Sequence, residues 1–270
     1  MKKQMKFLTL ALALFVGMTL TSCLDSDSDS TGYDGAGIVY VRHSMGVSYF
    51  ADALGNIYYP TAESLNAIQA NNPAFDMSSY RMAFIYYSWP DSESADASTP
   101  TLTQSYNIDL LSIQEVEVYD TEITSTQATM ESSMPETSPL LPLNAGSSSS
   151  GFPAMYDSAM LMATIGYFVG SESSLQNHRV RVAYVDEEVD PSSTEMTLYL
   201  RHDRGSDEGT TYTNYFYGGI NVSTAVQSFR AKTGNYPTRI VLKAKESQAA
   251  TTVLPSTYTN YTVTYKAPSE

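Results

Sequence analysis

The chain has 270 residues, 42% of them hydrophobic, and its formal net charge at pH 7 is −14. A chain of this length can form one large domain or two modest ones. The acidic charge argues against nucleic acid as a partner, because proteins that bind it need a basic surface that displaces counterions from the phosphates. It argues equally against electrostatic docking on anionic lipid.

The first 22 residues have the pattern of a secretory signal peptide. Lysines near the start precede an apolar stretch over residues 7–20, which is shorter than the roughly 18 residues that a permanent transmembrane helix needs. The sequence Leu-Thr-Ser-Cys then ends at Cys23, the only cysteine of the chain. This arrangement is typical of the acylation and cleavage site of a bacterial lipoprotein. We therefore predict that residues 1–22 are removed and that Cys23 carries a lipid such as palmitate, which attaches the protein to a membrane.

Residues 23–36 are predicted to form a polar, acidic tether. Asp25, Asp27 and Asp29 alternate with serines directly after the cysteine. Two interpretations are open: a solvated spacer, or the acidic signal that takes Bacteroidetes lipoproteins to the cell surface. We expect a lipid-anchored protein of the outer membrane, and the second interpretation adds exposure at the cell surface. Since no cysteine follows Cys23, disulfide bonds within the folded domains are excluded.

Residues 37–125 are predicted to form an OB-like β-barrel. Short β patterns bounded by turn residues are followed by a helical pattern that begins at Thr61, and two longer strands come after it. The expected strands are 38–41, 47–50, 57–59, 80–89 and 105–119, and the expected helix is 61–70. Three strands, a helix and two more strands is the order of a small OB-type barrel.

The rest of the chain is predicted to be a linker followed by an antiparallel β-sandwich. Residues 126–157 are rich in proline and contain a serine run, which favours a Pro/Ser-rich linker or long surface loop. From 158 to 270 six strands with turn signals between them indicate the sandwich. These strands are 160–169, 179–186, 195–203, 212–220, 239–246 and 258–266, with a short helix from Ser223 or Thr224 to Lys232. The predicted fold class is all-β.

Several segments together give the chain a resemblance to a known family. They are Cys23-Leu24-Asp25 after the signal peptide, RMAFIYY at 81–87, HRVRV at 178–182, LYLRHD at 198–203 and RIVL at 239–242. On these patterns the chain resembles the NigD-like lipoproteins of Bacteroidetes over nearly the whole mature sequence. The resemblance implies an N-terminal OB-like domain, a C-terminal β-sandwich and no defined catalytic activity. The family name traces to a bacteriocin-associated gene cluster. The linker looks expanded relative to a compact two-domain pattern.

The histidines are the first candidates for chemistry. His178 and His202 fall on neighbouring predicted strands, each on a face with apolar residues, and either could meet Asp186 or Asp203. A metal site needs three or four convergent ligands. A buried imidazole hydrogen-bonded to backbone or to a carboxylate is therefore the favoured interpretation.

The acidic residues offer only weak candidates. Asp203, Asp207 and Glu208 lie in a glycine-containing loop that could bind calcium, but their spacing differs from that of an EF-hand, so an exposed polar hairpin is favoured. There is no Gly-x-Ser-x-Gly nucleophile motif. Carboxylate pairs at hairpin ends leave glycoside hydrolysis open as an alternative. We expect neither a cofactor nor an enzymatic activity.

Tyrosines are the predicted ligand contacts. Tyr49, Tyr58 and Tyr86 lie on predicted barrel strands, and OB barrels bind ligands across their second and third strands. The competing interpretation is that tyrosine is a good strand residue with one end buried and one end wet. The expected function is a non-catalytic surface binding module for a protein, peptide or glycan, of the bacteriocin-associated or envelope type. The alternatives are a glycan-binding or polysaccharide-degrading protein and a structural subunit of an envelope complex.

Overall fold

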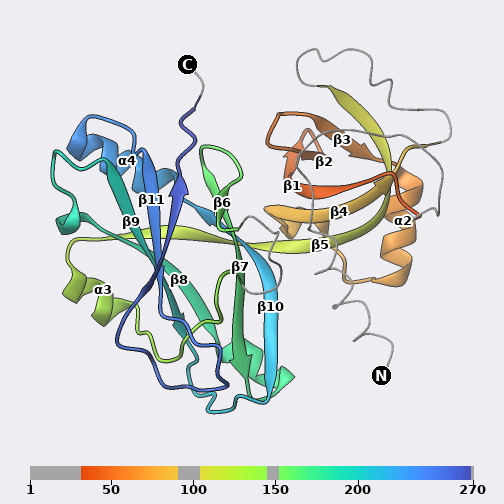
Figure 1. Cartoon of the computed structure of the whole chain (residues 1–270). Helices are drawn as coiled ribbons and strands as arrows, with labels where there is room; N and C mark the ends of the chain where they lie inside the picture. The colour runs from red at the N-terminus through yellow and green to blue at the C-terminus, as the bar shows by residue number, and fades with distance from the viewer. Residues whose placement is uncertain (1–31, 91–103, 145–151, 269–270) are drawn as a thin grey trace. The chain divides into compact units, whose positions relative to one another are not determined.

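The computed structural model describes residues 32–90, 104–144 and 152–268. The predicted signal peptide, Cys23 and most of the tether lie outside these residues. The chain divides into two compact units, one ending at Val118 and the other beginning at Tyr119. Both units consist mainly of β-strands (Figure 1), which confirms the predicted all-β fold class. No helix in the described ranges is long and apolar enough to cross a membrane.

The N-terminal unit contains the elements that the sequence predicts, in the same order. They are β1 (Gly35–Ser44), β2 (Val47–Ala51), β3 (Ile57–Pro60), α2 (Ala62–Asn71), the 3-10 turn η1 (Met77–Ser79), β4 (Met82–Ser88) and β5 (Ser105–Thr124). Thr61 caps α2 as its side chain accepts a hydrogen bond from Ser64 N. β1 starts at Gly35 and so takes in two residues that the sequence assigns to the tether. β5 continues beyond Val118 and contributes its last residues to the C-terminal unit.

The strand pairings of this unit close into a ring. β1 pairs with β2 and β4, β2 with β3, and β4 with β5, all antiparallel, while β3 and β5 pair in parallel. The ring order is therefore β1-β2-β3-β5-β4, with α2 between the third and fourth strands. Alternate side chains of these strands fill the interior; the buried ones include Val39, Val41, Phe50, Ala83, Ile85, Ile108 and Leu110. Five strands paired in a ring are compatible with the predicted OB-like barrel, which is five-stranded.

The β1–β2 turn holds a methionine in an unfavourable backbone conformation. Met45 and Gly46 have φ values of 50° and 80°, the positive values of a type I′ hairpin turn. Met45 is the single non-glycine residue with positive φ within the described ranges. Side chains with a Cβ resist this region, and asparagine tolerates it better than other non-glycine residues.

We expect Met45→Asn to stabilise the N-terminal unit by about 1 kcal/mol, because asparagine relieves the left-handed strain. Urea unfolding followed by the fluorescence of Trp89, the single tryptophan, measures this unit directly. Met45→Ala keeps the Cβ and serves as the control that brings no such gain. An unchanged unfolding midpoint for Met45→Asn would show that the turn is not strained.

The C-terminal unit contains all six predicted strands and the predicted helix. Its elements are α3 (Gln127–Ser133), β6 (Ala154–Met155), β7 (Met160–Val169), η2 (Glu172–Asn177), β8 (Arg179–Val185), η3 (Asp186–Glu188), β9 (Glu195–Asp203), β10 (Tyr212–Asn221), α4 (Ser223–Thr233), β11 (Arg239–Ala244) and β12 (Thr259–Thr264). Gly234 ends α4 in the left-handed conformation that favours glycine. The short elements α3 and β6 lie in the segment that the sequence predicts to be a linker.

The strand directions differ in part from those of the predicted antiparallel sandwich. One set of paired strands runs β12-β11-β9-β8 and ends on residues 121–124 of β5, and another joins β6, β7 and β10, of which β10 also pairs with β5. The pairs β9–β11 and β5–β8 are parallel, so the unit is mixed and the purely antiparallel prediction is wrong. The physical reason is the length of the connections: β10 and α4 lie between β9 and β11, and α3, β6, β7 and η2 lie between β5 and β8, which lets the second strand run in the same direction as the first.

The part of the predicted linker that the structure describes is packed into the C-terminal unit. Met130 and Met134, one helical turn apart, are buried, and Leu140 and Leu143 belong to the main core. Proline content made residues 126–157 look like an exposed loop. The buried methionines and leucines show instead that residues 126–144 cover strands of this unit.

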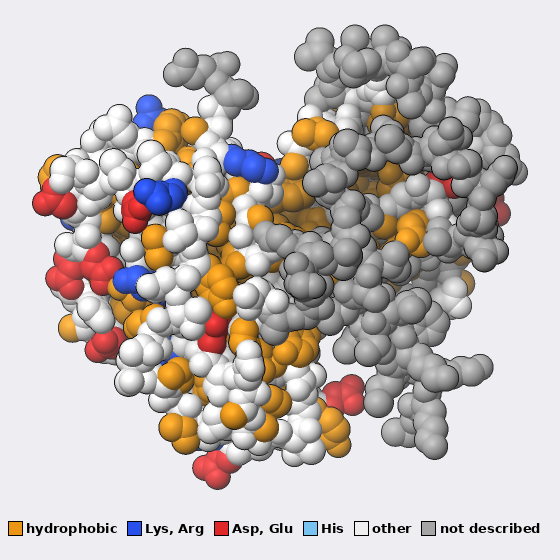
Figure 2. Space-filling model, in the orientation of Figure 1, with side chains coloured by type: hydrophobic (Ala, Val, Ile, Leu, Met, Phe, Trp, Pro, Cys, Tyr) orange, Lys and Arg blue, Asp and Glu red, His pale blue; other side chains and the backbone are white. Residues whose placement is uncertain are grey.

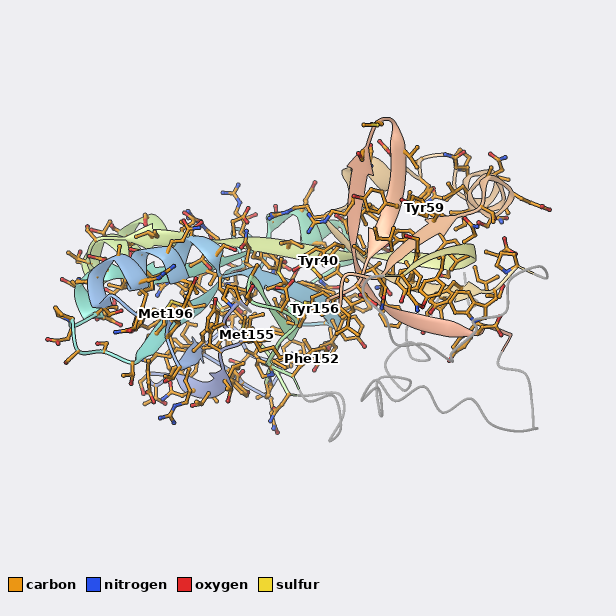
Figure 3. The ribbon with its side chains drawn as sticks, turned by 90° about the horizontal axis from the view of Figure 1, so that it is seen from above. Tyr40, Tyr59, Phe152, Met155, Tyr156 and Met196 are labelled. Carbon is orange, nitrogen blue, oxygen red and sulfur yellow. The ribbon has the colours of Figure 1, made fainter. Side chains whose placement is uncertain are left out.

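The core of the C-terminal unit joins alternate residues of both sets of strands with one face of α4. Met155 from β6 and Met196 from β9, labelled in Figure 3, are among its buried side chains. Leu198 and Leu200 follow Met196 on the same face of β9, and Phe229 contributes from α4. On the face seen in Figure 2, hydrophobic side chains are interspersed with polar ones, and acidic side chains lie along the outer edge of this unit.

Candidate functional site

A group of four aromatic rings lies on β3, β5 and the end of β4 in the N-terminal unit, with Trp89 directly after β4. The Tyr58 ring centroid is 5.6 Å from those of Tyr87 and Tyr106. Trp89 lies 5.2 Å from Tyr87 and 5.3 Å from Tyr106. All four side chains are half-buried. The four rings therefore lie at the edge of the barrel core, where part of each residue is accessible to solvent.

Asp52, in the β2–β3 turn, holds Tyr58 in this group. Its Oδ2 accepts hydrogen bonds from Tyr58 OH at 3.1 Å and from Asn56 Nδ2 at 2.8 Å. Its Oδ1 accepts from the backbone N–H groups of Leu54 and Asn56. Burial and the neighbouring carboxylate raise the pKa of Tyr58, so its hydroxyl stays protonated. Because four donors occupy Asp52, the carboxylate fixes the turn and the ring.

The structure does not gather the three predicted contact tyrosines into one group. Tyr58 faces the same side as its partner Phe50, whereas neighbours along a strand point to opposite sides, which puts Tyr49 on the other face. Tyr49 lies 5.7 Å from Tyr59, which is labelled in Figure 3. Tyr86 contacts other rings, with centroids of Tyr33 and Phe84 each 5.0 Å away.

Tyr87, Trp89 and Tyr106 were not predicted as partners of Tyr58. They lie far from Tyr58 in the sequence, and only the barrel register brings them into its group. The dense aromatic run 86–89 was the one available signal.

Two histidines and an aspartate form a buried chain of hydrogen bonds in the C-terminal unit. His178 Nδ1 lies 2.9 Å from His202 Nε2, and His178 Nε2 lies 3.0 Å from Asp207 Oδ2. The Tyr167 ring stacks on both histidines, with centroids 4.8 and 4.4 Å away. The side chains of His178 and Asp207 are only 1% and 6% exposed, and His202 is fully buried.

The Asp207 carboxylate determines which atom donates in each hydrogen bond of this series. Burial acts to raise the pKa of Asp207, but hydrogen bonds from Gly170 N, His178 and Gly209 N outweigh it and lower the pKa to about 2. An ionised Asp207 only accepts, so His178 Nε2 carries the proton. When both rings are neutral, His178 Nδ1 then accepts from His202 Nε2–H.

The second ring nitrogen of His202, Nδ1, lies in the protein interior. Its Nδ1 has no hydrogen-bond partner of normal geometry among the described residues, and it lies near the backbone of Ser138 and Pro139. Burial and the neighbouring His178 lower the pKa of His202 to about 4. The ring is therefore neutral at pH 7.

This arrangement does not suit metal binding. The two nitrogens of His178 point to different partners, so one ion could not be bound by both histidines and Asp207 together. Within residues 32–90, 104–144 and 152–268, no three His, Cys, Asp or Glu side chains are placed to hold a metal ion. His178 and His202 are buried and hydrogen-bonded to each other. The carboxylate that bonds His178 is Asp207, whereas Asp186 accepts a hydrogen bond from Lys232.

The three acidic candidates for calcium have separate surroundings. Asp203 Oδ1 accepts from Thr137 Oγ1 at 2.7 Å and from Gly205 N at 3.0 Å. Asp207 belongs to the histidine chain, and Glu208 is exposed. Asp207 also fixes a close approach of backbones, because a Cβ added to Gly209 would lie 2.2 Å from Gly170 Cα. The structure does not bring these three carboxylates together as an ion site.

A second buried charged group lies where residues 134–137 cover β9 and β11. Glu136 Oε2 is 3.6 Å from Arg201 Nη1 and 3.4 Å from Lys245 Nζ, and the Glu136 and Arg201 side chains are 3% and 6% exposed. Arg201 Nε also donates to Met134 O at 2.7 Å. Burial raises the pKa of Glu136 although both cations oppose that shift. Sequence reasoning missed this group because Glu136 lies in the predicted linker.

Comparison with known proteins gives structural relatives only. No protein-family model matches the chain, and no curated protein matches its sequence. A crystal structure of a candidate lipoprotein from Bacteroides fragilis is similar with a TM-score of 0.66 and 19% identity, covering 87% of this chain and 99% of that chain. A structure named as a toxin-related protein, from Parabacteroides distasonis, has a TM-score of 0.52 and 15% identity, covering 86% and 93%.

A protein of the family that the sequence resembles is also among the similar structures. A NigD-like immunity protein from Bacteroides caccae has a TM-score of 0.47 and 13% identity, covering 84% of this chain and 96% of that chain. At these identities the likeness concerns the fold alone, and the fold comparison rests on the two structures with higher TM-scores.

Proposed function

We propose that the protein is an outer-membrane lipoprotein, held by a lipid on Cys23, that acts by binding a ligand. The observation that carries this proposal is the sequence Leu-Thr-Ser-Cys at the end of a short apolar stretch with a basic start. Such a stretch is typical of a signal peptide and too short for a permanent span. The similar structure of a candidate lipoprotein from Bacteroides fragilis supports the same assignment.

The binding role is supported by the aromatic side chains of the N-terminal unit. Tyr49 and Tyr86 lie on the opposite face of their strands from the core residues Phe50 and Ile85, where a ligand could stack on them. A protein, a peptide or a glycan could use such a surface, since aromatic rings combine apolar area with a polar edge. That the protein is not an enzyme stays a prediction, as does the alternative of a polysaccharide-degrading activity.

Protease shaving of intact cells tests the proposal. We expect an added protease to remove the protein from intact cells, because a surface lipoprotein that captures an external ligand must be accessible from outside. A periplasmic protein in the same cells is the control and should survive until the outer membrane is permeabilised. If this protein also survives until then, capture of an external ligand is wrong. Replacing Asp25, Asp27 and Asp29 by alanine then tests whether the tether is the export signal.

A further inference from the structure

The hairpin of β1 and β2 extends beyond the ring of barrel strands. β1 pairs with β4 only through Gly35–Tyr40, and β2 pairs with β3 only at Phe50 and Ala51. In the described strand pairings, residues 42–49 pair only with one another. We refer to residues 42–49 as the β1–β2 finger. It is a two-stranded ribbon whose strand pairing with the barrel is confined to its base, and β1 also contacts η1, where the pKa of Asp76 is lowered by hydrogen bonds from Ser78 and also by His43.

The tip of the β1–β2 finger is apolar and exposed. Met45 is fully exposed, at 102% of its reference surface, and Val47 is 52% exposed. Exposed apolar residues occurring singly are normal on protein surfaces. Met45, however, also has a φ of 50°, at a turn position where glycine or asparagine would be unstrained. The methionine at this turn is therefore strained, and its exposed side chain adds nothing to the packing of the protein. Backbone outliers of this kind cluster at functional sites.

Contacts along the β1–β2 finger stiffen it. His43 Nδ1 and Ser48 Oγ are 2.7 Å apart across the two strands. At the base, Arg42 lies 4.5 Å above the Tyr40 ring, and Tyr49 contacts Tyr59. A tip held in one conformation loses little entropy when it binds. The β1–β2 finger is therefore built to present Met45 and Val47.

The charge of the β1–β2 finger differs from that of the rest of its unit. Arg42 and Arg81 are the only arginines or lysines between positions 22 and 118, whereas the same stretch holds many aspartates and glutamates. No acidic residue lies between Asp34 and Asp52. The acidic surface of the whole unit would be repelled by an anionic bilayer. A pocket in a partner protein can contact the β1–β2 finger alone, so a protein partner is favoured.

We propose that the β1–β2 finger docks into a partner protein, with Met45 and Val47 entering an apolar pocket whose rim carries carboxylates facing Arg42. This inference rests on the proposed binding function and names the element that performs it. Methionine suits such an anchor because its flexible, polarisable side chain adapts to an irregular pocket.

Photo-crosslinking in cells tests the proposal, with p-benzoylphenylalanine in place of Val47. The matched control carries the crosslinker in place of Leu54, which is 65% exposed on the turn at the other end of β2. We expect one discrete protein adduct from position 47, none from position 54, and loss of the adduct with Arg42→Glu. An adduct with lipid or with a second copy of this chain, or no adduct, would overturn the proposal.

The purified crosslinked partner then allows a direct titration. Met45→Asn should weaken binding at least about tenfold, whereas Met45→Leu should keep the affinity close to that of the wild type. Because asparagine suits the turn, a loss of binding by Met45→Asn cannot come from unfolding. If the partner binds Met45→Asn as tightly as the wild type, the role of the β1–β2 finger is wrong while the binding function of the protein stands.

Discussion

Between pH 7 and pH 4 the burial of His202 will cost the C-terminal unit about 3 kcal/mol of unfolding free energy. The pKa of His202 is about 4 in the folded protein because its ring is buried beside His178, whereas an unfolded chain gives histidine a pKa of about 6.5. Between these two values the unfolded state binds a proton that the folded state does not. Stability is therefore complete above about pH 6.5 and falls as the pH drops toward 4.

Urea unfolding at a series of pH values, followed by far-ultraviolet circular dichroism, measures this effect. His202→Phe should lower the stability at pH 7, because His178 Nδ1 loses its donor, but it should remove most of the change between pH 7 and 4. His43→Gln is the matched control, since His43 is exposed and its loss should leave the pH dependence intact. Equal pH dependence in wild type and His202→Phe would contradict this assignment. Asp207, with a pKa of about 2, loses its contribution only below about pH 4.

Arg201→Met is expected to cost about 3 kcal/mol of unfolding free energy, because it leaves Glu136 buried with one cation fewer and removes the donor to Met134 O. Both charged side chains are almost fully buried. Because Lys245 remains near Glu136, we expect a loss of stability at the lower end of the range for breaking a buried ion pair. Urea unfolding of the C-terminal unit at pH 7 measures the change.

The neighbouring strand offers a matched control for this prediction. Arg181 pairs with Arg201 across β8 and β9, but its salt bridge with Glu122 is exposed, with side-chain exposures of 34% and 44%. Arg181→Met should therefore cost no more than about 1 kcal/mol. Adding Glu136→Met to Arg201→Met should recover most of the loss, since a buried ion pair can be replaced by apolar residues. A loss below that of Arg181→Met would show that the buried group is not structural.

Local structure was predictable because it depends on short-range patterns. Alternation along 198–203 places His202 on the face of Leu198 and Leu200, and the structure shows all three buried. The strand and helix order of the N-terminal unit likewise follows from turn residues and apolar spacing. These features need only the pleat of a strand and the period of a helix.

Long-range partners were not predictable in this way. Asp207 reaches His178 across 29 positions of sequence, and nothing in the loop distinguishes it from Asp203. The parallel pairing of β9 with β11 depends on where α4 returns the chain, which periodicity does not report. Glu136 could not be recognised because prolines nearby resemble those of a linker. Met45 lies in the turn between the predicted strands 38–41 and 47–50, but its positive φ value is seen only in the structure.

Lipid attachment at Cys23 is the most direct test of the proposed function. Cells grown with a labelled palmitate analogue should incorporate the label into the wild-type protein, which should fractionate with the outer membrane. Cys23→Ala should carry no label and leave that fraction, whereas the alanine variant of Asp25, Asp27 and Asp29 should keep the label. A wild-type protein without label, or a Cys23→Ala protein that remains labelled, would contradict the assignment of this chain as a lipoprotein.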